Sequence, residues 1–296
     1  MRMVLSVSAA LVVGLCLGGC LAGDRAGGTA QPERSVIHDT GSDTMLNLAL
    51  AWAEAYREIA PDVDVAVTGG GSGTGIAGLL NGTVDIANAS RSLKSDEITD
   101  AKKAGFTPIE HQVAIDALAV IVHTSNPVAA LTIAQLADIY TGRVRNWREV
   151  GGRDAPIVPV SRESNSGTHV YFLERVIRRG DSENNDIFAP SALLMPSSVG
   201  ITSEVRRNPN AIGYDGLGYV SAETERIVAV AETADGPFVM PSTASAADGS
   251  YPLSRPLFMD THEDPSAAVA SYLGWIVGPD GQAIVSDLGF VPIAAE

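Results

Sequence analysis

Apolar and polar residues along this chain form short blocks that switch between strand-like and helix-like periods. Short apolar or alternating runs predict strands at 36–38, 63–67, 83–91, 113–122 and 157–160. Apolar residues at helical spacing predict helices at 45–59, 76–80, 95–104, 132–141, 172–177, 197–207, 266–277 and 281–288. Because strands and helices take turns along the chain, the predicted fold class is α/β.

The stretch from 178 to 258 carries weaker signals. Residues 178–189 are polar and loop-like, and residues 211–220 indicate a strand pair broken by glycines. Residues 222–249 are small and polar, and their pattern assigns no element. Residues 251–258 are expected to be extended, because prolines at both ends of this stretch forbid a helix.

Three of the predicted strands end in a turn rich in Gly, Ser or Thr that leads into a helix, at 41–44, 69–75 and 161–168. A helix N-terminus offers unpaired backbone N–H groups and the positive end of the helix dipole. Such turns can meet at the carboxyl ends of strands, where open α/β sheets bind ligands. None of the three has the Gly-Lys-Ser/Thr ending of a nucleotide-binding P-loop. A small anion therefore fits better than a nucleotide.

These turns contain donors suited to an anion. The candidate ligands are Ser42, Thr44, Ser72, Arg162, Ser166, Gly167 and Thr168. Arg162 has a planar fork that suits a tetrahedral oxyanion, and Gly167 lets the backbone come close to a ligand. The alternative for the third turn is that Ser166 or Thr168 only caps the following helix.

Composition limits the partners of this chain. It has 296 residues, 45% of them hydrophobic, which is enough for more than one compact core. The formal net charge of −15 argues against nucleic acid or an anionic membrane surface as a partner. The same charge repels an anion, so an anion site must depend on local donors in a closed cleft. No metal-binding motif is present in the sequence, and we expect neither a metal nor a cofactor.

Residues 1–19 are predicted to be a targeting segment, because an apolar run of small residues follows Arg2 and is too short to span a bilayer. The ending Leu-Gly-Gly-Cys at 17–20 resembles the lipobox of bacterial lipoproteins, in which the cysteine is acylated. We therefore expect a lipoprotein signal peptide and lipidation of Cys20. The alternative is an ordinary cleaved signal peptide. Residues 20–34 are then a flexible tether.

Asp116 is the one charge within the apolar run 113–122. A buried carboxylate is costly without hydrogen-bond partners. Asp116 therefore either bonds to backbone at a strand crossing or serves a ligand.

Eight stretches, in chain order, match one known family. They are Gly-Ser-Asp-Thr (41–44), Gly-Ser-Gly-Thr-Gly (71–75), Ala-Ser-Arg (89–91), 131–142 with Asn-Trp (146–147), 161–168, Ala-Ile-Gly-Tyr (211–214), Tyr-Pro-Leu-Ser-Arg-Pro (251–256), and Gly-Gln-Ala-Ile (281–284) with Leu-Gly-Phe (288–290). In these stretches the chain resembles the phosphate-binding proteins of bacterial phosphate ABC importers, a branch of the periplasmic-binding-protein superfamily. The resemblance covers essentially the whole chain after the targeting segment.

The resemblance implies a two-lobed α/β fold with two hinge crossings and the anion held in a central cleft. We expect lobe 1 to contain residues 35–118 and 253–296, and lobe 2 residues 119–252. Phosphate contacts are implied for Ser42 and Thr44 in the first turn and for Ser72 in the second. In the third turn they are implied for Arg162, Ser166, Gly167 and Thr168.

Charged positions near the expected site depart from the family pattern. Some members have an Asp at the position of Arg91, where it accepts the proton of hydrogen phosphate. Here Asp116 is the obvious acidic substitute, and Arg91 either adds charge next to the anion or pairs with Asp116. We expect Asp43 to turn away from the anion and cap a helix.

The predicted function is a lipid-anchored, non-catalytic receptor on the outer face of the cell membrane or in the periplasm, which delivers inorganic phosphate to ABC importer permease subunits. One alternative is a hydrolase that uses Ser72 or Ser166, although neither serine lies in a G-x-S-x-G motif. A second alternative is phosphate binding for sensing or adhesion. Sulfate is a rival ligand, but it lacks the proton that a buried acceptor recognises in phosphate.

Overall fold

The structure is a computed structural model that describes residues 34–293. The expected signal segment, Cys20 and the tether up to residue 33 lie outside the described residues. The strands are β1 (Ser35–Gly41), β2 (Val63–Thr68), β3 (Ile86–Ala89), β4 (Pro108–His123), β5 (Ala130–Thr132), β6 (Val158–Arg162), β7 (Leu193–Met195), β8 (Ala211–Gly216), β9 (Glu225–Ala231) and β10 (Ser254–His262). The α-helices are α1 (Leu46–Ile59), α2 (Ser72–Leu80), α3 (Ser95–Ala104), α4 (Ile133–Tyr140), α5 (Gly167–Phe172), α6 (Ser198–Arg207), α7 (Thr243–Ala247), α8 (Ala267–Ile276) and α9 (Pro279–Asp287). Two short 3-10 helices cover Trp147–Val150 and Leu217–Tyr219, and a π-helical turn, Leu173–Ile177, continues α5.

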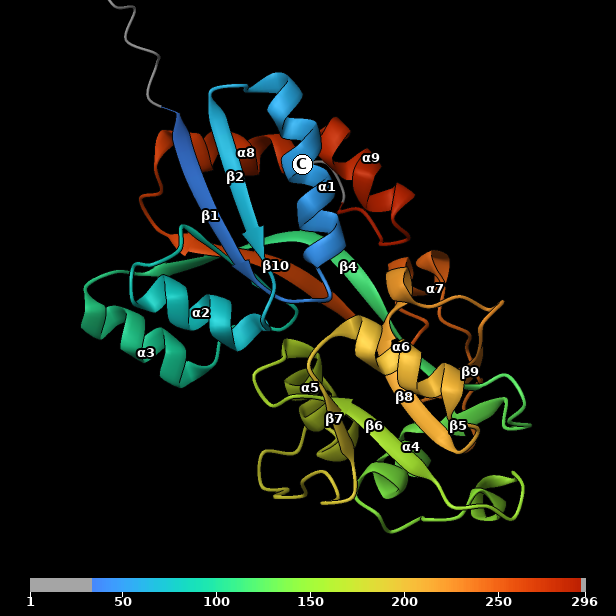
Figure 1. Cartoon of the computed structure of the whole chain (residues 1–296). Helices are drawn as coiled ribbons and strands as arrows, with labels where there is room; N and C mark the ends of the chain where they lie inside the picture. Colours follow the sequence, from blue (N-terminus) through green and yellow to red (C-terminus); the bar gives the residue numbers. More distant parts are fainter. Residues whose placement is uncertain (1–33, 294–296) are drawn as a thin grey trace, which may run out of the picture. The chain divides into compact units, whose positions relative to one another are not determined.

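The long strand β4 takes part in both halves of the sheet (Figure 1). Along the main path the strand order is β2-β1-β3-β10-β4-β8-β6-β7, while β9 pairs with β4 and β5. Residues 108–117 of β4 pair with β10, and residues 118–123 pair with β8 and β9. Since β4 continues from one half into the other, the two halves meet at this strand.

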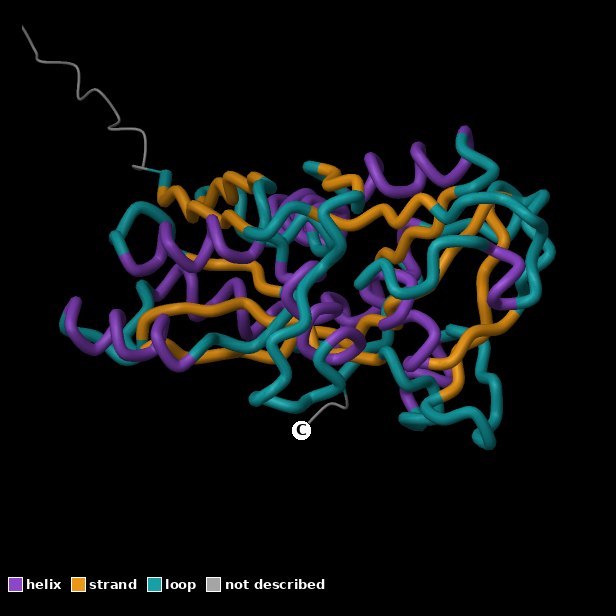
Figure 2. Tube along the Cα trace, turned by 90° about the horizontal axis from the view of Figure 1, so that it is seen from below, coloured by secondary structure: helices purple, strands orange, loops and turns teal. Residues whose placement is uncertain are grey.

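Each half has its own hydrophobic core, with helices on both faces of its strands (Figures 1 and 2). In the first half, α1, α8 and α9 pack on one face and α2 and α3 on the other. In the second half, α4 and α5 pack on one face and α6 on the other. This arrangement confirms the predicted two-lobed α/β fold class. We keep the names lobe 1 and lobe 2 with the residue boundaries predicted above, which stay predictions.

Most elements form where the periodicity predicts them, because each buries the face that carries its apolar residues. Helix α3 has the expected bounds, and Glu97 Oε2 accepts a hydrogen bond from Lys94 N (2.8 Å) at its start. Helix α4 begins after Thr132, whose Oγ1 accepts a hydrogen bond from Gln135 N (3.1 Å). The three Gly/Ser/Thr turns each connect a strand to a helix, as expected.

The expectation of a strand pair at 211–220 is wrong. Strand β8 ends at Gly216 and a 3-10 helix follows. Leu217 N donates to Asp116 Oδ1 (3.3 Å) rather than to a neighbouring strand, which explains why the extended chain stops there. The stretch 222–249, to which the sequence pattern assigned no element, contains β9 and α7.

Candidate anion-binding site

The three Gly/Ser/Thr turns come together where lobe 1 meets lobe 2. Their hydroxyl-bearing candidates and the backbone of Gly167 are buried. These residues are Ser42, Thr44, Ser72, Ser166, Gly167 and Thr168. Contacts place Thr44 beside Thr168 and Ser72 beside Gly167, so donors of all three turns lie together between the lobes. Ser42 and Ser166 are buried in the same turns.

Two pairs of hydroxyl groups lie in contact where the three turns meet. Thr44 Oγ1 of lobe 1 and Thr168 Oγ1 of lobe 2 are 2.8 Å apart and share a hydrogen bond. Ser72 Oγ lies 3.4 Å from Ser90 Oγ and accepts a hydrogen bond from Ser90 N (3.1 Å). Sequence reasoning missed Ser90, although it follows β3 in the Ala-Ser-Arg stretch.

Gly167 allows the turns of the two lobes to approach this closely. A Cβ atom added at Gly167 would lie 2.6 Å from Ser90 Oγ and would overlap Ser72 Oγ. The cluster of Thr44, Ser72, Ser90 and Thr168 can form around the backbone of Gly167 because this residue has no side chain.

Arg255, at the start of β10, is the cation in contact with this hydroxyl cluster. Its Nη2 donates to Thr168 Oγ1 (3.0 Å) and to Thr44 Oγ1 (3.4 Å), and its Nη1 donates to the carbonyl of Ser90 (3.1 Å). Its guanidinium also lies 5.3 Å from the centre of the Tyr171 ring, a cation–π contact. The sequence analysis placed Arg255 in an extended segment that matches the family, but it did not include this residue among the site residues. The available signal was a single cation between two prolines, Pro252 and Pro256, at the start of β10.

Asp116 pairs with Arg255, not with Arg91. Arg255 Nε and Nη2 donate to Asp116 Oδ2 at 3.1 and 2.9 Å. The two residues face each other in the register between β4 and β10, and both side chains are almost fully buried. The carboxylate also lies against Gly216, where an added Cβ would be 3.0 Å from Oδ1. The sequence-based alternative in which Asp116 pairs with Arg91 is therefore wrong.

Arg91 forms its ion pair with Glu97 at the start of α3. Its Nη2 lies 2.6 Å from Glu97 Oε1, and its Nη1 donates to Glu97 Oε2 and to the carbonyl of Ser92, both at 2.8 Å. Both Nη atoms of Arg91 therefore bond to groups at or just before the start of α3.

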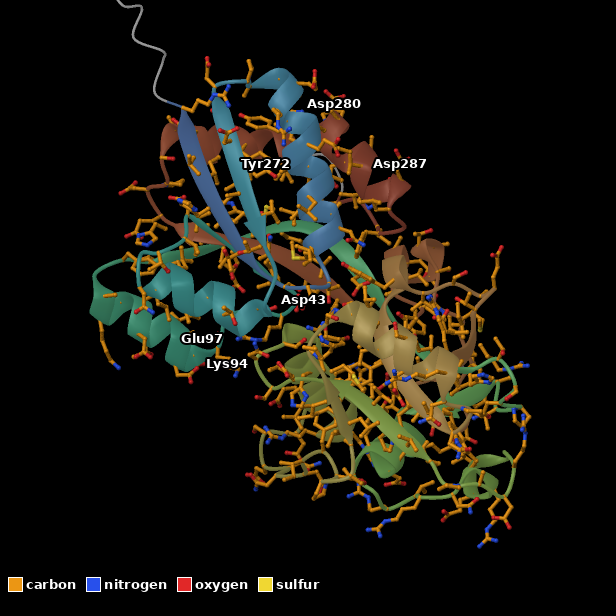
Figure 3. All side chains as sticks on the ribbon, in the orientation of Figure 1. Asp43, Lys94, Glu97, Tyr272, Asp280 and Asp287 are labelled. Atoms are coloured by element: carbon orange, nitrogen blue, oxygen red, sulfur yellow. The ribbon has the colours of Figure 1, made fainter. Side chains whose placement is uncertain are left out.

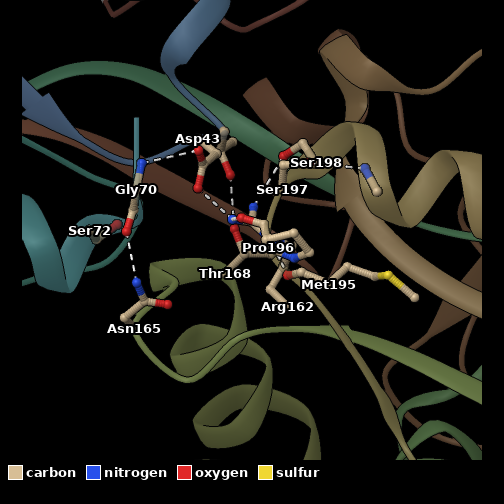
Figure 4. Close-up of polar contacts among 12 residues, drawn as sticks. Asp43, Gly70, Ser72, Arg162, Asn165, Thr168, Met195, Pro196, Ser197 and Ser198 are labelled. Carbon is tan, nitrogen blue, oxygen red and sulfur yellow. Dashed lines mark hydrogen bonds and ion pairs between the residues drawn. The ribbon is translucent and has the colours of Figure 1, made fainter. Parts of the chain in front are cut away.

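Asp43 does not cap a helix, and that expectation is wrong. Its Oδ2 accepts a hydrogen bond from Arg162 Nη2 at 2.5 Å, as drawn in Figure 4. Helix α1 follows Met45, and no side chain caps its start. The reason is electrostatic: lobe 2 brings the charged fork of Arg162 next to Asp43, and an opposite charge is a stronger partner than a backbone N–H.

Arg162 is also held by groups of its own lobe. Its Nη1 donates to Ser198 Oγ (3.3 Å), and Ser198 Oγ in turn donates to Asp215 Oδ1 (2.9 Å). Asp215 is fully buried, and burial raises the pKa of its carboxyl group to about 6, although the positive charge of Arg162 opposes this shift. Arg162 therefore lies between Asp43 of lobe 1 and, through Ser198, Asp215 of lobe 2.

The arrangement can bind a small oxyanion, because it combines hydroxyl donors with two buried guanidinium groups and one buried acceptor, Asp116. Within residues 34–293, no group of three or more His, Cys, Asp or Glu side chains is placed to hold a metal ion. In the same part of the chain, no helix has the length and apolar character needed to cross a membrane.

Known proteins share this fold over most of its length. A family model described as a PBP superfamily domain matches residues 26–280. The phosphate-binding protein PstS of Pseudomonas aeruginosa is 32% identical over 277 residues, which cover 88% of this chain and 84% of that protein. The PstS of Bacillus subtilis is 30% identical over 255 residues, or 86% of this chain and 79% of that protein.

Solved structures of phosphate transport proteins are also similar to this chain. A substrate-binding protein of Clostridium perfringens, solved with bound phosphate, is 34% identical with a TM-score of 0.78, covering 88% of this chain and 100% of that one. An ABC-type phosphate transport receptor of Vibrio cholerae is 30% identical with a TM-score of 0.70, covering 87% and 100%. The fold and the site between its lobes define a solute-binding protein. The chain belongs to the phosphate-binding proteins of the PBP superfamily.

Proposed function

We propose that this protein binds inorganic phosphate between its lobes and delivers it to the permease subunits of an ABC importer. The observation that carries the proposal is the contact of Thr44, Thr168 and Arg255, in which hydroxyls from both lobes meet one buried cation. A tetrahedral oxyanion accepts hydrogen bonds on every side and so matches a ring of donors. The relationship to PstS proteins supports phosphate as this oxyanion.

The proposed phosphate ligands are the residues of the three turns together with Arg255 and Ser90. They are Ser42, Thr44, Ser72, Ser90, Arg162, Ser166, Gly167, Thr168 and Arg255, with Asp116 as acceptor of the phosphate proton. We leave Arg91 out of this set, because Glu97 and the carbonyl of Ser92 engage its guanidinium.

Calorimetry of phosphate-stripped protein with four oxyanions tests this function. Phosphate and arsenate are expected to bind, because both carry a proton near neutral pH that Asp116 can accept. Sulfate and molybdate are expected to bind more weakly, by on the order of 10⁴-fold, because they leave the buried acceptor without a donor. Equal binding of phosphate and sulfate would contradict the assignment, and absence of phosphate binding would end it.

The proposal includes no catalysis. Members of this family are substrate-binding proteins, and a hydrolase based on Ser72 would require an adjacent general base. The hydrogen bonds of Ser72 Oγ in the described part of the chain are to Ser90. We therefore prefer binding and release over bond cleavage.

We further propose that the protein is held at the outer face of the cell membrane by a lipid on Cys20, which lies outside the described residues. Cys20→Ala is expected to release the protein from membranes, because the acylated residue is lost. Fractionation of cells measures the release, and mass spectrometry of the native N-terminus provides the control. An unmodified N-terminus at any other residue contradicts the lipid anchor.

A further inference from the structure

A buried ion pair joins the two lobes next to the hydroxyl cluster. Asp43 lies in the turn between β1 and α1 of lobe 1, where lobe 1 faces lobe 2 (Figure 3), and Arg162 ends β6 of lobe 2. Their charged atoms are 2.5 Å apart, and the side chains are only 11% and 2% exposed. Because its two members belong to different lobes, this pair can exist only while the lobes are closed.

The carboxylate of Asp43 is fixed within lobe 1 by the second Gly-rich turn. Gly70 N donates to Asp43 Oδ1 (3.2 Å), and a Cβ atom added at Gly69 would lie 2.6 Å from the same oxygen. The main chain of Asp43 also contacts lobe 2, since Tyr219 OH donates to its carbonyl (2.7 Å). Asp43 thus has a defined position that depends on the absence of a side chain at Gly69.

Arg162 is oriented by acceptors on two sides. Nε donates to the carbonyl of Met195 (3.3 Å), and Nη2 donates to the carbonyl of Pro196 (3.0 Å) as well as to Asp43. With Ser198 on Nη1, four of the five guanidinium N–H groups are engaged, which leaves one on Nη1. The partners of Arg162 thus determine in which direction its remaining donor points.

We propose that Asp43 is a positioning residue that orients Arg162 across the lobe interface and slows the release of the bound anion. The proposal rests on the proposed function for the identity of that anion. Asp43 stays paired with Arg162 when the site is filled, so the pair stabilises the closed form both with and without the anion and is broken when the lobes open. Loss of one member of a buried charge pair acts mainly on the dissociation rate.

The test compares Asp43→Asn with Gly69→Ala, which displaces the carboxylate of Asp43 but keeps its charge. The matched control is Asp100→Asn, which removes a charge from lobe 1 at an exposed pair with Lys103. Stopped-flow tryptophan fluorescence with inorganic phosphate measures association and dissociation rates. Thermal melting of each variant measures any general loss of stability.

Both variants are expected to release phosphate about tenfold faster or more, while the association rate stays within about threefold of the wild type. The control is expected to match the wild type in both rates. A role limited to the folding of lobe 1 would lower the melting temperature without this selective change in dissociation. Dissociation rates in both variants within about twofold of the wild type overturn the proposal.

Small-angle scattering of phosphate-free protein separates this inference from the proposed function. Asp43→Asn is expected to have a larger radius of gyration than the wild type, because one tie between the lobes is lost. If the wild type fails to bind phosphate, the proposed function is wrong, and the scattering still decides the inference. Identical radii for the two phosphate-free proteins overturn it.

Discussion

Arg255→Ala is expected to weaken phosphate binding by about 2–5 kcal/mol, the range for losing one member of a buried charge pair. Arg255 is the cation that contacts both Thr44 and Thr168, and its side chain is 1% exposed. Its loss removes a positive charge from the anion site and leaves the carboxylate of Asp116 without its ionic partner. Calorimetry with phosphate measures the loss of affinity.

Two further variants separate a loss of phosphate binding from a loss of stability, since an unpaired Asp116 also destabilises the fold. Arg255→Lys keeps the charge but loses the planar fork, and it is expected to recover part of the affinity. Arg148→Ala, at an exposed pair with Asp154, is the control for a change in net charge. Folded Arg255→Ala protein that binds phosphate as tightly as the Arg148 control would show that Arg255 is only structural.

Asp116→Asn is expected to weaken phosphate binding and to narrow the preference for phosphate over sulfate by on the order of 10²-fold or more. The Asp116 carboxylate can accept the P–OH hydrogen of hydrogen phosphate, whereas it repels sulfate, which offers only acceptors. An amide in its place can donate to either anion. Competition calorimetry with the two anions measures the ratio of affinities.

The rival role for Asp116 is to hold Arg255 in place without touching the anion. The two hydrogen bonds from Arg255 and the one from Leu217 N give it a structural function in either case. Under the rival, Asp116→Asn lowers the melting temperature and the affinity for phosphate and sulfate together. An unchanged ratio of the two affinities therefore removes Asp116 from the set of residues that recognise the ligand.

The order of helices and strands could be predicted because each depends on residues close in the chain. The apolar face of 45–59 and the alternation at 63–67 express such local periods, and α1 and β2 form there. The prediction of a strand pair at 211–220 was wrong, because the strand ends at Gly216 and Leu217, whose N–H bonds to Asp116, begins a 3-10 helix. That bond joins residues 101 positions apart, which no local period contains.

The sequence by itself determined the three Gly/Ser/Thr turns, their place between strand and helix, and the hydroxyl groups they carry. These properties follow from composition and spacing within a few residues. The two lobes were implied by the resemblance of eight ordered stretches to phosphate-binding proteins.

Only the tertiary structure decided which charges pair. Asp43 meets Arg162 across 119 positions, and Asp116 meets Arg255 across 139. The sequence does not show which cation each carboxylate meets. Asp43 was expected to cap a helix, and Asp116 was expected to accept the phosphate proton, with a pair to Arg91 as the alternative. The strongest partner of a buried charge is the opposite charge that the fold brings within hydrogen-bond distance, and that distance is set by the register of β4 on β10 and by the meeting of the lobes.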